Sequence, residues 1–203
     1  TSLVSNYNGY QISCYGLSDG FVDLSVSGSV PPYSYSWSNG SFIENINSVV
    51  AGDYVFSIID ENNCAITDTV TLNEPTDLIS SHVVSDYNGY QVSCYGLSDG
   101  WIDASVSGSV PPYSYSWSNG LNSEDIYSLT SGTYDLIITD VNNCTSFENI
   151  NMLEPSQLNS SFQTSDYNSY AISCFGYNDG SIDISVNGSV PPYSYSWSNG
   201  SST

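Results

Sequence analysis

Hydrophobic and polar residues alternate in several short segments of this chain. Val22, Leu24 and Val26 share one face of an extended segment, and the residues between them are polar. The alternation returns at residues 101–107 and 181–187. A period of two predicts a half-buried antiparallel strand, and no segment shows helical periodicity.

Turn residues divide the first part of the chain into further predicted strands. Asp19-Gly20 predicts a tight turn, Pro31-Pro32 marks the start of a strand, and Asn39-Gly40 predicts a two-residue hairpin. The strands expected from this pattern are residues 10–14, 21–27, 33–38, 53–59 and 64–72, with a weaker one in 43–50. Residues 76–86 are expected to form a short connector or a first strand.

The chain repeats with a period of eighty residues. Residues 29–40 recur letter for letter at 109–120 and 189–200. The repeat predicts three domains: residues 1–76, 77–156 and an incomplete third at 157–203. Six or seven short strands in each repeat predict an all-β fold of immunoglobulin-like antiparallel β-sandwiches. The repeats are expected to follow one another as an elongated rod or filament.

The charge balance excludes several classes of partner. The 203 residues include no Lys or Arg against 21 Asp and Glu, which gives a formal net charge of −21. Nucleic-acid binding and adsorption to anionic lipid both depend on cationic side chains, so neither partner is expected. No apolar run approaches the roughly 18 residues of a membrane-spanning helix, so no membrane insertion is expected. His82 is the one side chain that can become a cation.

Five cysteines occupy two positions of the repeat. Because a domain of about 80 residues is small and benefits from internal staples, bonds within each repeat are favoured: Cys14–Cys64 and Cys94–Cys144, with the partner of Cys174 outside the sequence. A rival register, Cys64–Cys94 and Cys144–Cys174, would join neighbouring repeats, and free buried thiols are a third reading. Either disulfide pattern implies an oxidising, extracytoplasmic setting.

Several short motifs recur together in the repeats. They are Ile/Val-Ser-Cys, Asp-Gly, Pro-Tyr-x-Tyr-x-Trp-Ser-Asn-Gly, Gly-x-Tyr, Asp-x-Asn-Asn-Cys and Glu-Pro. This combination resembles the SprB repeat of large cell-surface adhesins of gliding bacteria of the Bacteroidetes phylum, over both complete repeats and most of the front half of the third. The resemblance implies a long surface protein, exported by the type IX secretion system, that attaches cells to a substrate. Family members often carry Gly where Ser29, Ser109 and Ser189 stand, so this turn is expected to differ.

Aromatic side chains offer a candidate binding surface. Tyr33, Tyr35 and Trp37 could stack against sugar rings, but their shared face is expected to lie in the sandwich core. Phe21, Trp101 and Ser181 occupy an outward position that varies between copies. The candidate for carbohydrate binding is therefore Trp101.

Turn acids are candidate ligands for Ca²⁺, the one cofactor considered. Carboxylates suit Ca²⁺ at the millimolar affinity of extracellular modules, although the Asp-x-Asn-Asn spacing lacks the full EF-hand pattern and solvated acids are the alternative. The candidate ligands are Asp19, Asp23, Asp60, Asp99, Asp103 and Asp140.

Candidate glycan-attachment sites are of two kinds. One is the Asn-x-Ser/Thr sequon, and the other is Asp68-Thr69-Val70, which matches a short O-glycosylation pattern of the same bacterial phylum. The candidate residues are Asn39, Thr69, Asn143, Asn159, Asn187 and Asn199.

The function expected from these patterns is structural and adhesive. His82 has no counterpart in the other repeats, and no nucleophile–base constellation is visible, so an enzyme is not expected. We expect a segment of a surface adhesin filament, located outside the cell. Its expected partners are the neighbouring repeats and, as further options, surface polysaccharide or other copies of the filament. The alternatives are a carbohydrate-binding array and the passive stalk of a secreted hydrolase.

Overall fold

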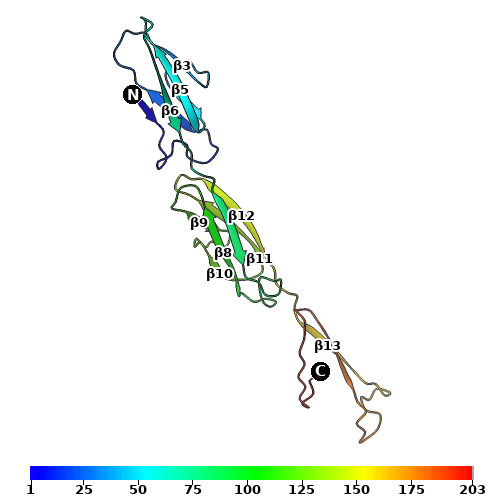
Figure 1. The fold of residues 1–203 in the computed structure, drawn as a ribbon. Helices are drawn as coiled ribbons and strands as arrows, with labels where there is room; N and C mark the ends of the chain where they lie inside the picture. Colours follow the sequence, from blue (N-terminus) through cyan, green and yellow to red (C-terminus); the bar gives the residue numbers. More distant parts are fainter. Residues whose placement is uncertain (203) are drawn as a thin grey trace. The chain divides into compact units, whose positions relative to one another are not determined.

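The computed structural model describes residues 1–202 and contains only strands and turns over that range (Figure 1). The strands of the first repeat are β1 (Ser2–Val4), β2 (Gly20–Leu24), β3 (Ser34–Trp37), β4 (Ile46–Val49), β5 (Gly52–Ile59) and β6 (Ala65–Leu72). Those of the second are β7 (Ile79–Val84), β8 (Gly100–Ser107), β9 (Ser114–Trp117), β10 (Ile126–Leu129), β11 (Gly132–Thr139) and β12 (Thr145–Met152). Those of the third are β13 (Asn159–Thr164) and β14 (Ile182–Asn187).

Each complete repeat forms two three-stranded sheets. The first repeat has the orders β1-β2-β4 and β3-β5-β6, and the second repeats them as β7-β8-β10 and β9-β11-β12. The strand pairs whose register is known are antiparallel, and the longest runs the full length of β5 and β6, from Gly52 opposite Leu72 to Ile59 opposite Ala65. The prediction of an all-β, immunoglobulin-like sandwich is confirmed.

The alternating residues of the two sheets form the core of the first repeat. Its buried cluster comprises Val22, Leu24, Trp37, Ile46, Val49, Tyr54, Phe56, Ile58 and Leu72. Every residue eighty positions later is buried as well, from Ile102 to Met152. Tyr33 and Tyr35 are half-buried and pack against the cluster, so the prediction that this aromatic face belongs to the core is confirmed.

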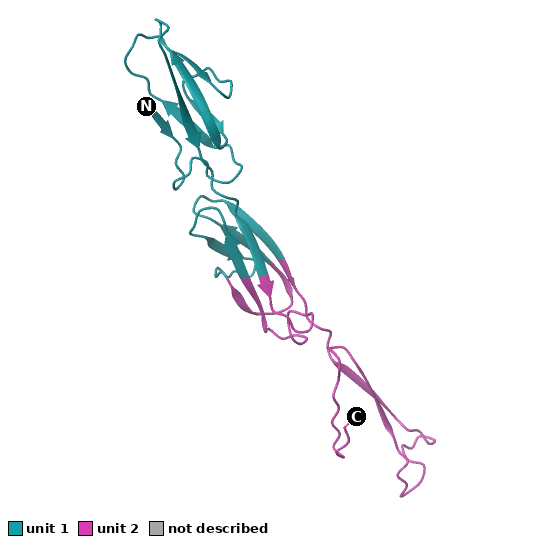
Figure 2. Ribbon diagram, viewed as in Figure 1, with its two compact units in different colours: residues 1–82, 104–124, 135–149 teal, residues 83–103, 125–134, 150–203 magenta. Residues whose placement is uncertain are grey.

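Contacts divide the chain into two compact units, which Figure 2 draws in teal and magenta. One comprises residues 1–82, 104–124 and 135–149, and the other residues 83–103, 125–134 and 150–203. The division passes through the second repeat, whereas strand pairing joins only strands of the same repeat. The domain boundaries read from the sequence stay a prediction.

The third repeat retains only one of these sheets, as a two-stranded pair of β13 and β14. Its residues 193–197 form no strand, and Trp197 is half-buried where Trp37 is buried. In the first repeat, β3 pairs with β5 alone.

Three local predictions are wrong. Residues 11–14 are bends rather than a strand, with only an isolated bridge between Tyr7 and Tyr10. Gly20 does not turn the chain but begins β2, where a Cβ would lie 2.6 Å from Ile12 Cδ1 and 2.9 Å from the Val49 carbonyl oxygen. Asn39-Gly40 makes a tight turn without a hairpin, because the next strand, β4, joins β2 in the opposite sheet.

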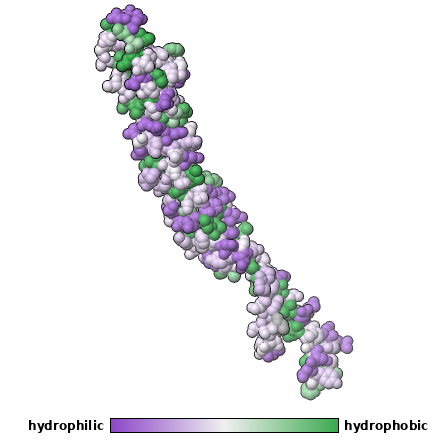
Figure 3. All heavy atoms as spheres, in the orientation of Figure 1, coloured by the Kyte–Doolittle hydropathy of each residue, from purple (hydrophilic) through white to green (hydrophobic). Residues whose placement is uncertain are grey.

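Hydrophobic residues on the molecular face drawn in Figure 3 stand in small groups among hydrophilic ones. Residues 1–202 contain no helix long and apolar enough to cross a membrane.

Replacing Trp37 tests the core assignment. Trp37 is 4% exposed, its ring centroid lies 5.2 Å from that of Phe56, and its Nε1 donates to the Ile43 carbonyl at 2.9 Å. Trp37→Ala leaves a cavity and an unpaired carbonyl, so the unfolding free energy of the first repeat should fall by about 3–5 kcal/mol in denaturant titrations. Phe42→Ala, at a side chain that is 76% exposed, is the control. Equal effects of the two substitutions would refute the core position of Trp37.

Candidate functional site

A disulfide and several side-chain hydrogen bonds join the first and second repeats. Two segments meet at this junction. We call Asp140–Cys144, which connects β11 to β12, and its copy Asp60–Cys64 the cysteine turns. We call Tyr7–Cys14, which precedes β2, and its copies Tyr87–Cys94 and Tyr167–Cys174 the tyrosine loops.

An aspartate organises each cysteine turn. In the second repeat, Asp140 Oδ1 accepts hydrogen bonds from the backbone N–H groups of Asn142 and Cys144, both at 2.8 Å. Its Oδ2 accepts from the Ser109 hydroxyl at 2.5 Å. Asn143 has a positive φ of 68°, a conformation that Asn adopts more readily than most residues. Asx-type bonding within the turn and the hydrogen bond from Ser109 together fix its conformation.

Ser29, Ser109 and Ser189 occupy the position at which members of the resembled family often carry glycine. They have positive φ values of 60°, 48° and 49°, a region that glycine enters without steric cost. Serine adds what glycine lacks, because the Ser29 hydroxyl donates to the Asp60 carboxylate, as Ser109 does to Asp140. Sequence reasoning missed this role, although the eighty-residue recurrence of Ser29 and Asp60 was visible.

Each tyrosine loop is also closed by its own hydrogen bonds. Tyr7 N donates to the Tyr10 carbonyl at 2.7 Å, and the Tyr7 hydroxyl donates to the Asp19 carbonyl at 3.3 Å. Ser13 N donates to Asp19 Oδ1 at 3.1 Å. The loop therefore presents a fixed set of backbone carbonyls to its surroundings.

The cysteine turn of the second repeat enters the tyrosine loop of the first. Asn142 Nδ2 donates to the Ser13 carbonyl at 3.1 Å and to the Tyr7 carbonyl at 3.4 Å, while its Oδ1 accepts from Asn8 Nδ2 at 2.6 Å. Beside it, Cys14 and Cys144 form a disulfide with a Cα–Cα distance of 5.7 Å. Cys144 is 8% exposed and Ser13 is 8% exposed, so the contact is largely closed to solvent.

Hydrogen bonds and burial also fix the linker peptide between the two repeats. Glu74 Oε2 accepts from Gly16 N at 2.6 Å, Pro75 is fully buried, and Ser109 N donates to the Thr76 carbonyl at 2.9 Å. Gly108 has a φ of +81°, and a Cβ there would lie 1.8 Å from the Asp77 carbonyl oxygen. Only glycine fits this approach, so the junction restricts the linker from both sides.

Both predicted disulfide registers are wrong. The structure has no Cys14–Cys64 or Cys94–Cys144 bond, and Cys64, Cys94 and Cys174 are free and exposed, so neither the Cys64–Cys94 nor the Cys144–Cys174 bond exists. Gln11 N and Ile12 N donate to the Asn73 carbonyl, so the segment that leads to Cys14 lies beside the end of β6. Cys64 directly precedes the start of β6. The eight residues of β6 span roughly 23 Å, whereas a disulfide requires Cα atoms within about 7 Å.

The candidate calcium ligands are dispersed. Asp19 and Asp99 accept hydrogen bonds from Ser13 N and Ser93 N, and Asp23 and Asp103 are exposed on β2 and β8. Asp60 and Asp140 serve the cysteine turns. Within residues 1–202, no three or more His, Cys, Asp or Glu side chains gather as a metal site. Calcium binding stays a prediction.

Trp101 is half-buried on β8, where its cross-strand neighbour on β10 is Tyr127, which is 62% exposed. Carbohydrate binding at this position stays a prediction. The candidate glycosylation residues lie on exposed positions, and their modification also stays a prediction: Asn39, Thr69, Asn143, Asn159, Asn187 and Asn199.

His82 lies beside Glu148, with Nδ1 3.2 Å from Oε2. Ser80 Oγ donates to the other oxygen of Glu148 at 2.6 Å and lies 2.7 Å from Ser146 Oγ. The carboxylate stands between the hydroxyl and the imidazole, so the serine–histidine–acid order of a catalytic triad is not formed by these side chains. The group links β7 to β12.

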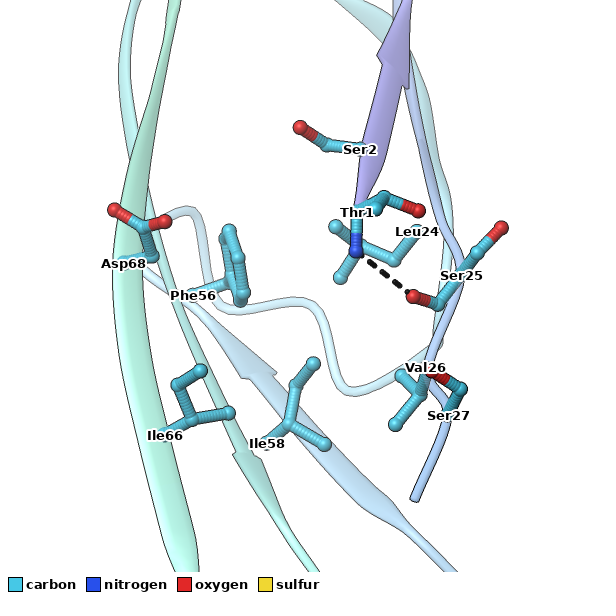
Figure 4. A pocket seen from close by; sticks show the side chains of 10 residues that line it. All are labelled: Thr1, Ser2, Leu24, Ser25, Val26, Ser27, Phe56, Ile58, Ile66 and Asp68. Carbon is cyan, nitrogen blue, oxygen red and sulfur yellow. Dashed lines mark hydrogen bonds between the residues drawn. The ribbon is translucent and has the colours of Figure 1, made fainter.

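A pocket of about 250 Å³ opens at the corresponding edge of the first repeat (Figure 4). Leu24, Phe56 and Ile58 line its floor, and the Thr1 amino group donates to the Ser25 carbonyl at 3.0 Å. Its lining holds hydroxyls and a single carboxylate, that of Asp68, but no His or Cys, so it does not bring reactive groups together.

Peptide mapping without reduction should recover Cys14 linked to Cys144. The bond closes a loop of 130 residues, for which the chain-entropy treatment gives about 5 kcal/mol. Cys14→Ser with Cys144→Ser should lower the unfolding free energy by up to this amount, while Cys64→Ser, at an exposed free thiol, should leave it unchanged. Recovery of a Cys14–Cys64 peptide would refute the junction described above.

Stability should fall in acid because turn carboxylates are protonated. Hydrogen bonds from the Ser29 hydroxyl and the Cys64 backbone hold the pKa of Asp60 below its ordinary value of 3.8, and the Ser93 hydroxyl does the same for the pKa of Asp99. A lowered folded-state pKa contributes stability that is present above pH 3.8 and is lost as the pH falls through the lowered value. Denaturation midpoints measured from pH 6 to pH 2 should show this loss.

Asp60→Asn should flatten that pH dependence, because the variant has no carboxylate to protonate in this turn. Asp23→Asn, exposed on β2, is the matched control and should retain the wild-type slope. Identical slopes in wild-type and Asp60→Asn would contradict the role given to the Asp60 carboxylate.

Comparison with known proteins places the chain in a family. The protein-family model of the SprB repeat matches it three times, at residues 10–42, 90–122 and 171–202, which is the front half of each repeat rather than its whole length. No curated protein matches the chain. Among solved structures, it is similar to the amphioxus IgVJ-C2 molecule, at 14% identity over 66% of this chain and 94% of that one, with a TM-score of 0.31.

It is also similar to the C-terminal 282-residue fragment of intimin, solved with the intimin-binding domain of the translocated intimin receptor. That match has 14% identity, covers 70% of this chain and 59% of the other, and has a TM-score of 0.39. The family match falls on Cys14, Cys94 and Cys174 and on the three Pro-Tyr-Ser-Tyr-Ser-Trp segments, the first two of which contribute a buried Trp to a core. This chain belongs to the SprB-repeat family.

Proposed function

We propose that the chain is a segment of a cell-surface, adhesin-like protein in which tandem repeats form a stalk for a binding region elsewhere in the protein. The observation that carries this proposal is the repeat junction. There, one disulfide and the three hydrogen bonds of the Asn142 side chain join two consecutive sandwiches. A connection of this kind restricts the relative motion of the domains it joins, which is what a stalk requires.

The second junction supports the proposal, because its linker repeats the contacts of the first. Glu154 Oε2 accepts from Gly96 N at 2.6 Å, and Ser189 N donates to the Ser156 carbonyl at 2.7 Å. A Cβ on Gly188 would lie 1.9 Å from the Gln157 carbonyl oxygen, as one on Gly108 would from Asp77. A linker that recurs every eighty residues would place successive repeats at equal intervals. The proposal therefore includes an elongated filament.

An extracellular location is part of the same proposal. SprB repeats occur in cell-surface proteins, and a disulfide is suited to an oxidising compartment. The net charge of −21 keeps such a protein soluble and separate from its neighbours. Export by type IX secretion and a role in gliding are further proposals that rest on the family resemblance alone.

Distance measurements between spin labels test the stalk. With Cys174→Ser, nitroxide labels on the free thiols Cys64 and Cys94 report on the first two repeats. Pulsed electron–electron double resonance should give one narrow distribution of distances between the two labels. The distribution should broaden when Cys14 and Cys144 are replaced by serine. A broad distribution in the disulfide-bonded chain would refute a stalk built on this junction.

A further inference from the structure

Two side chains of the second repeat converge on one carbonyl group of the first. The Ser13 carbonyl accepts a hydrogen bond from Asn142 Nδ2 at 3.1 Å, and Cys144 Sγ lies 3.3 Å from the same oxygen. Ser13 directly precedes Cys14, the cysteine to which Cys144 is bonded. The contact that holds the Asn142 amide therefore also holds Cys144 beside Cys14.

One carboxylate ties Asn142 to Cys144 within the second repeat. Asp140 Oδ1 accepts hydrogen bonds from the backbone N–H groups of both residues, each at 2.8 Å. A single turn thus presents the amide and the cysteine in a fixed relation. Fewer torsions remain to be fixed when this turn meets the tyrosine loop, which lowers the entropic cost of bringing the two sulfur atoms together.

The conformations of the two segments do not depend on the disulfide, because their copies have them without it. In the turn Asp60–Cys64, whose cysteine is free, the aspartate Oδ1 accepts from the N–H groups of Asn62 and Cys64 at 2.9 and 2.8 Å. The tyrosine loop Tyr87–Cys94, whose cysteine is also free, has the same pair of backbone hydrogen bonds at its start as Tyr7–Cys14. Each segment is therefore ready to make its contacts before any sulfur is oxidised.

A small oxidant can reach the two cysteines while the segments are in contact. Cys14 and Cys144 line one pocket of about 300 Å³, together with Tyr15, Leu17 and Leu78. Tyr15 and Leu17 are 57% and 46% exposed, so this side of the junction faces solvent. Oxidation therefore does not require the docked segments to separate.

We propose that Asn142 selects the partner of Cys144. Its side chain docks in the tyrosine loop while both cysteines are thiols, and oxidation then joins the pair that docking has placed together. Asn142 is a positioning residue, because its hydrogen bonds are to the Ser13 and Tyr7 carbonyls and to Asn8. This inference concerns how the junction forms and does not depend on the stalk proposed above.

The oxidation is an exchange between the two thiols and a small disulfide such as oxidised glutathione. One cysteine thiolate attacks oxidised glutathione, forms a mixed disulfide and releases one glutathione thiolate. The other cysteine thiolate then attacks the sulfur of the first, forms the Cys14–Cys144 bond and releases the second glutathione. The protein thiols lose two electrons and two protons, and oxidised glutathione gains both as it becomes two thiols. Docking favours the second attack, because it raises the effective concentration of one cysteine at the other.

Thiol–disulfide equilibria of the 203-residue chain test the proposal. Replacing the free cysteines Cys64, Cys94 and Cys174 by serine leaves one pair of thiols, whose effective concentration is measured against mixtures of reduced and oxidised glutathione. Asn142→Ala removes the docking amide, so this effective concentration should fall about tenfold, as expected for the loss of one or two hydrogen bonds. Equal values in the parent chain and in Asn142→Ala would overturn the proposal.

Two further substitutions serve as controls. Asn62→Ala makes the same change at the equivalent, exposed position of the first repeat and should leave the effective concentration unchanged. Asn142→Asp keeps the shape of the side chain but puts an oxygen where Nδ2 donates to two carbonyls, so it should lower the value at least as far as Asn142→Ala. Retention of the parent value by Asn142→Asp would mean that the side chain only fills space, and would overturn its selecting role.

The register of the bond is a readout that a general loss of stability would not change. After oxidation of the chain with all five cysteines, peptide mapping should recover Cys14–Cys144 as the main pair. In Asn142→Ala, the yield of this pair should fall and pairs that include the other cysteines should rise. Far-ultraviolet circular dichroism should still show the β-sheet signal, because the buried cores do not include Asn142. An unchanged distribution of pairs in the folded variant would contradict selection by Asn142.

Discussion

The length of β6 determines how this chain is cross-linked. The two cysteines of a repeat stand at opposite ends of that eight-residue strand, so they cannot reach each other. Each can reach only a cysteine that another repeat brings to the same end. The disulfide therefore joins successive domains instead of stapling one domain, and the stability of each sandwich depends on its buried cluster of hydrophobic side chains.

A chain without Lys or Arg must satisfy its acidic groups by other means, and the structure shows how. The carboxylates of Asp60, Asp140 and Glu74 accept hydrogen bonds from backbone N–H groups and serine hydroxyls of turns and linkers. Bonds to a charged acceptor are stronger than neutral ones, so these contacts take the place that salt bridges have in other proteins. They lie at the ends of the sandwiches, and those of Asp140 and Glu74 lie where the first two repeats meet.

Sequence reasoning predicted what depends on local periodicity. The alternation around Val22 predicted β2 and its buried face, and the Tyr-x-Tyr-x-Trp pattern placed Trp37 in the core. It was wrong where the outcome depends on which sheet a strand joins. Asn39-Gly40 is a hairpin signal, yet the next strand, β4, pairs with β2 and adds Ile46 and Val49 to the core cluster. The contacts of Asn142 could not be predicted from the sequence, because they join residues more than 120 positions apart.

The register of the disulfide also changes how a pulling force passes through the chain. Cys14 and Cys144 enclose every strand from β2 to β11 in one covalent loop. Tension that reaches Cys14 along the backbone crosses the S–S bond directly to Cys144, so the strands within the loop carry no sustained load while the bond is intact. A bond confined to one repeat would shield only the strands of that repeat. A bond that joins successive repeats shields most of one sandwich and most of the next from such a force.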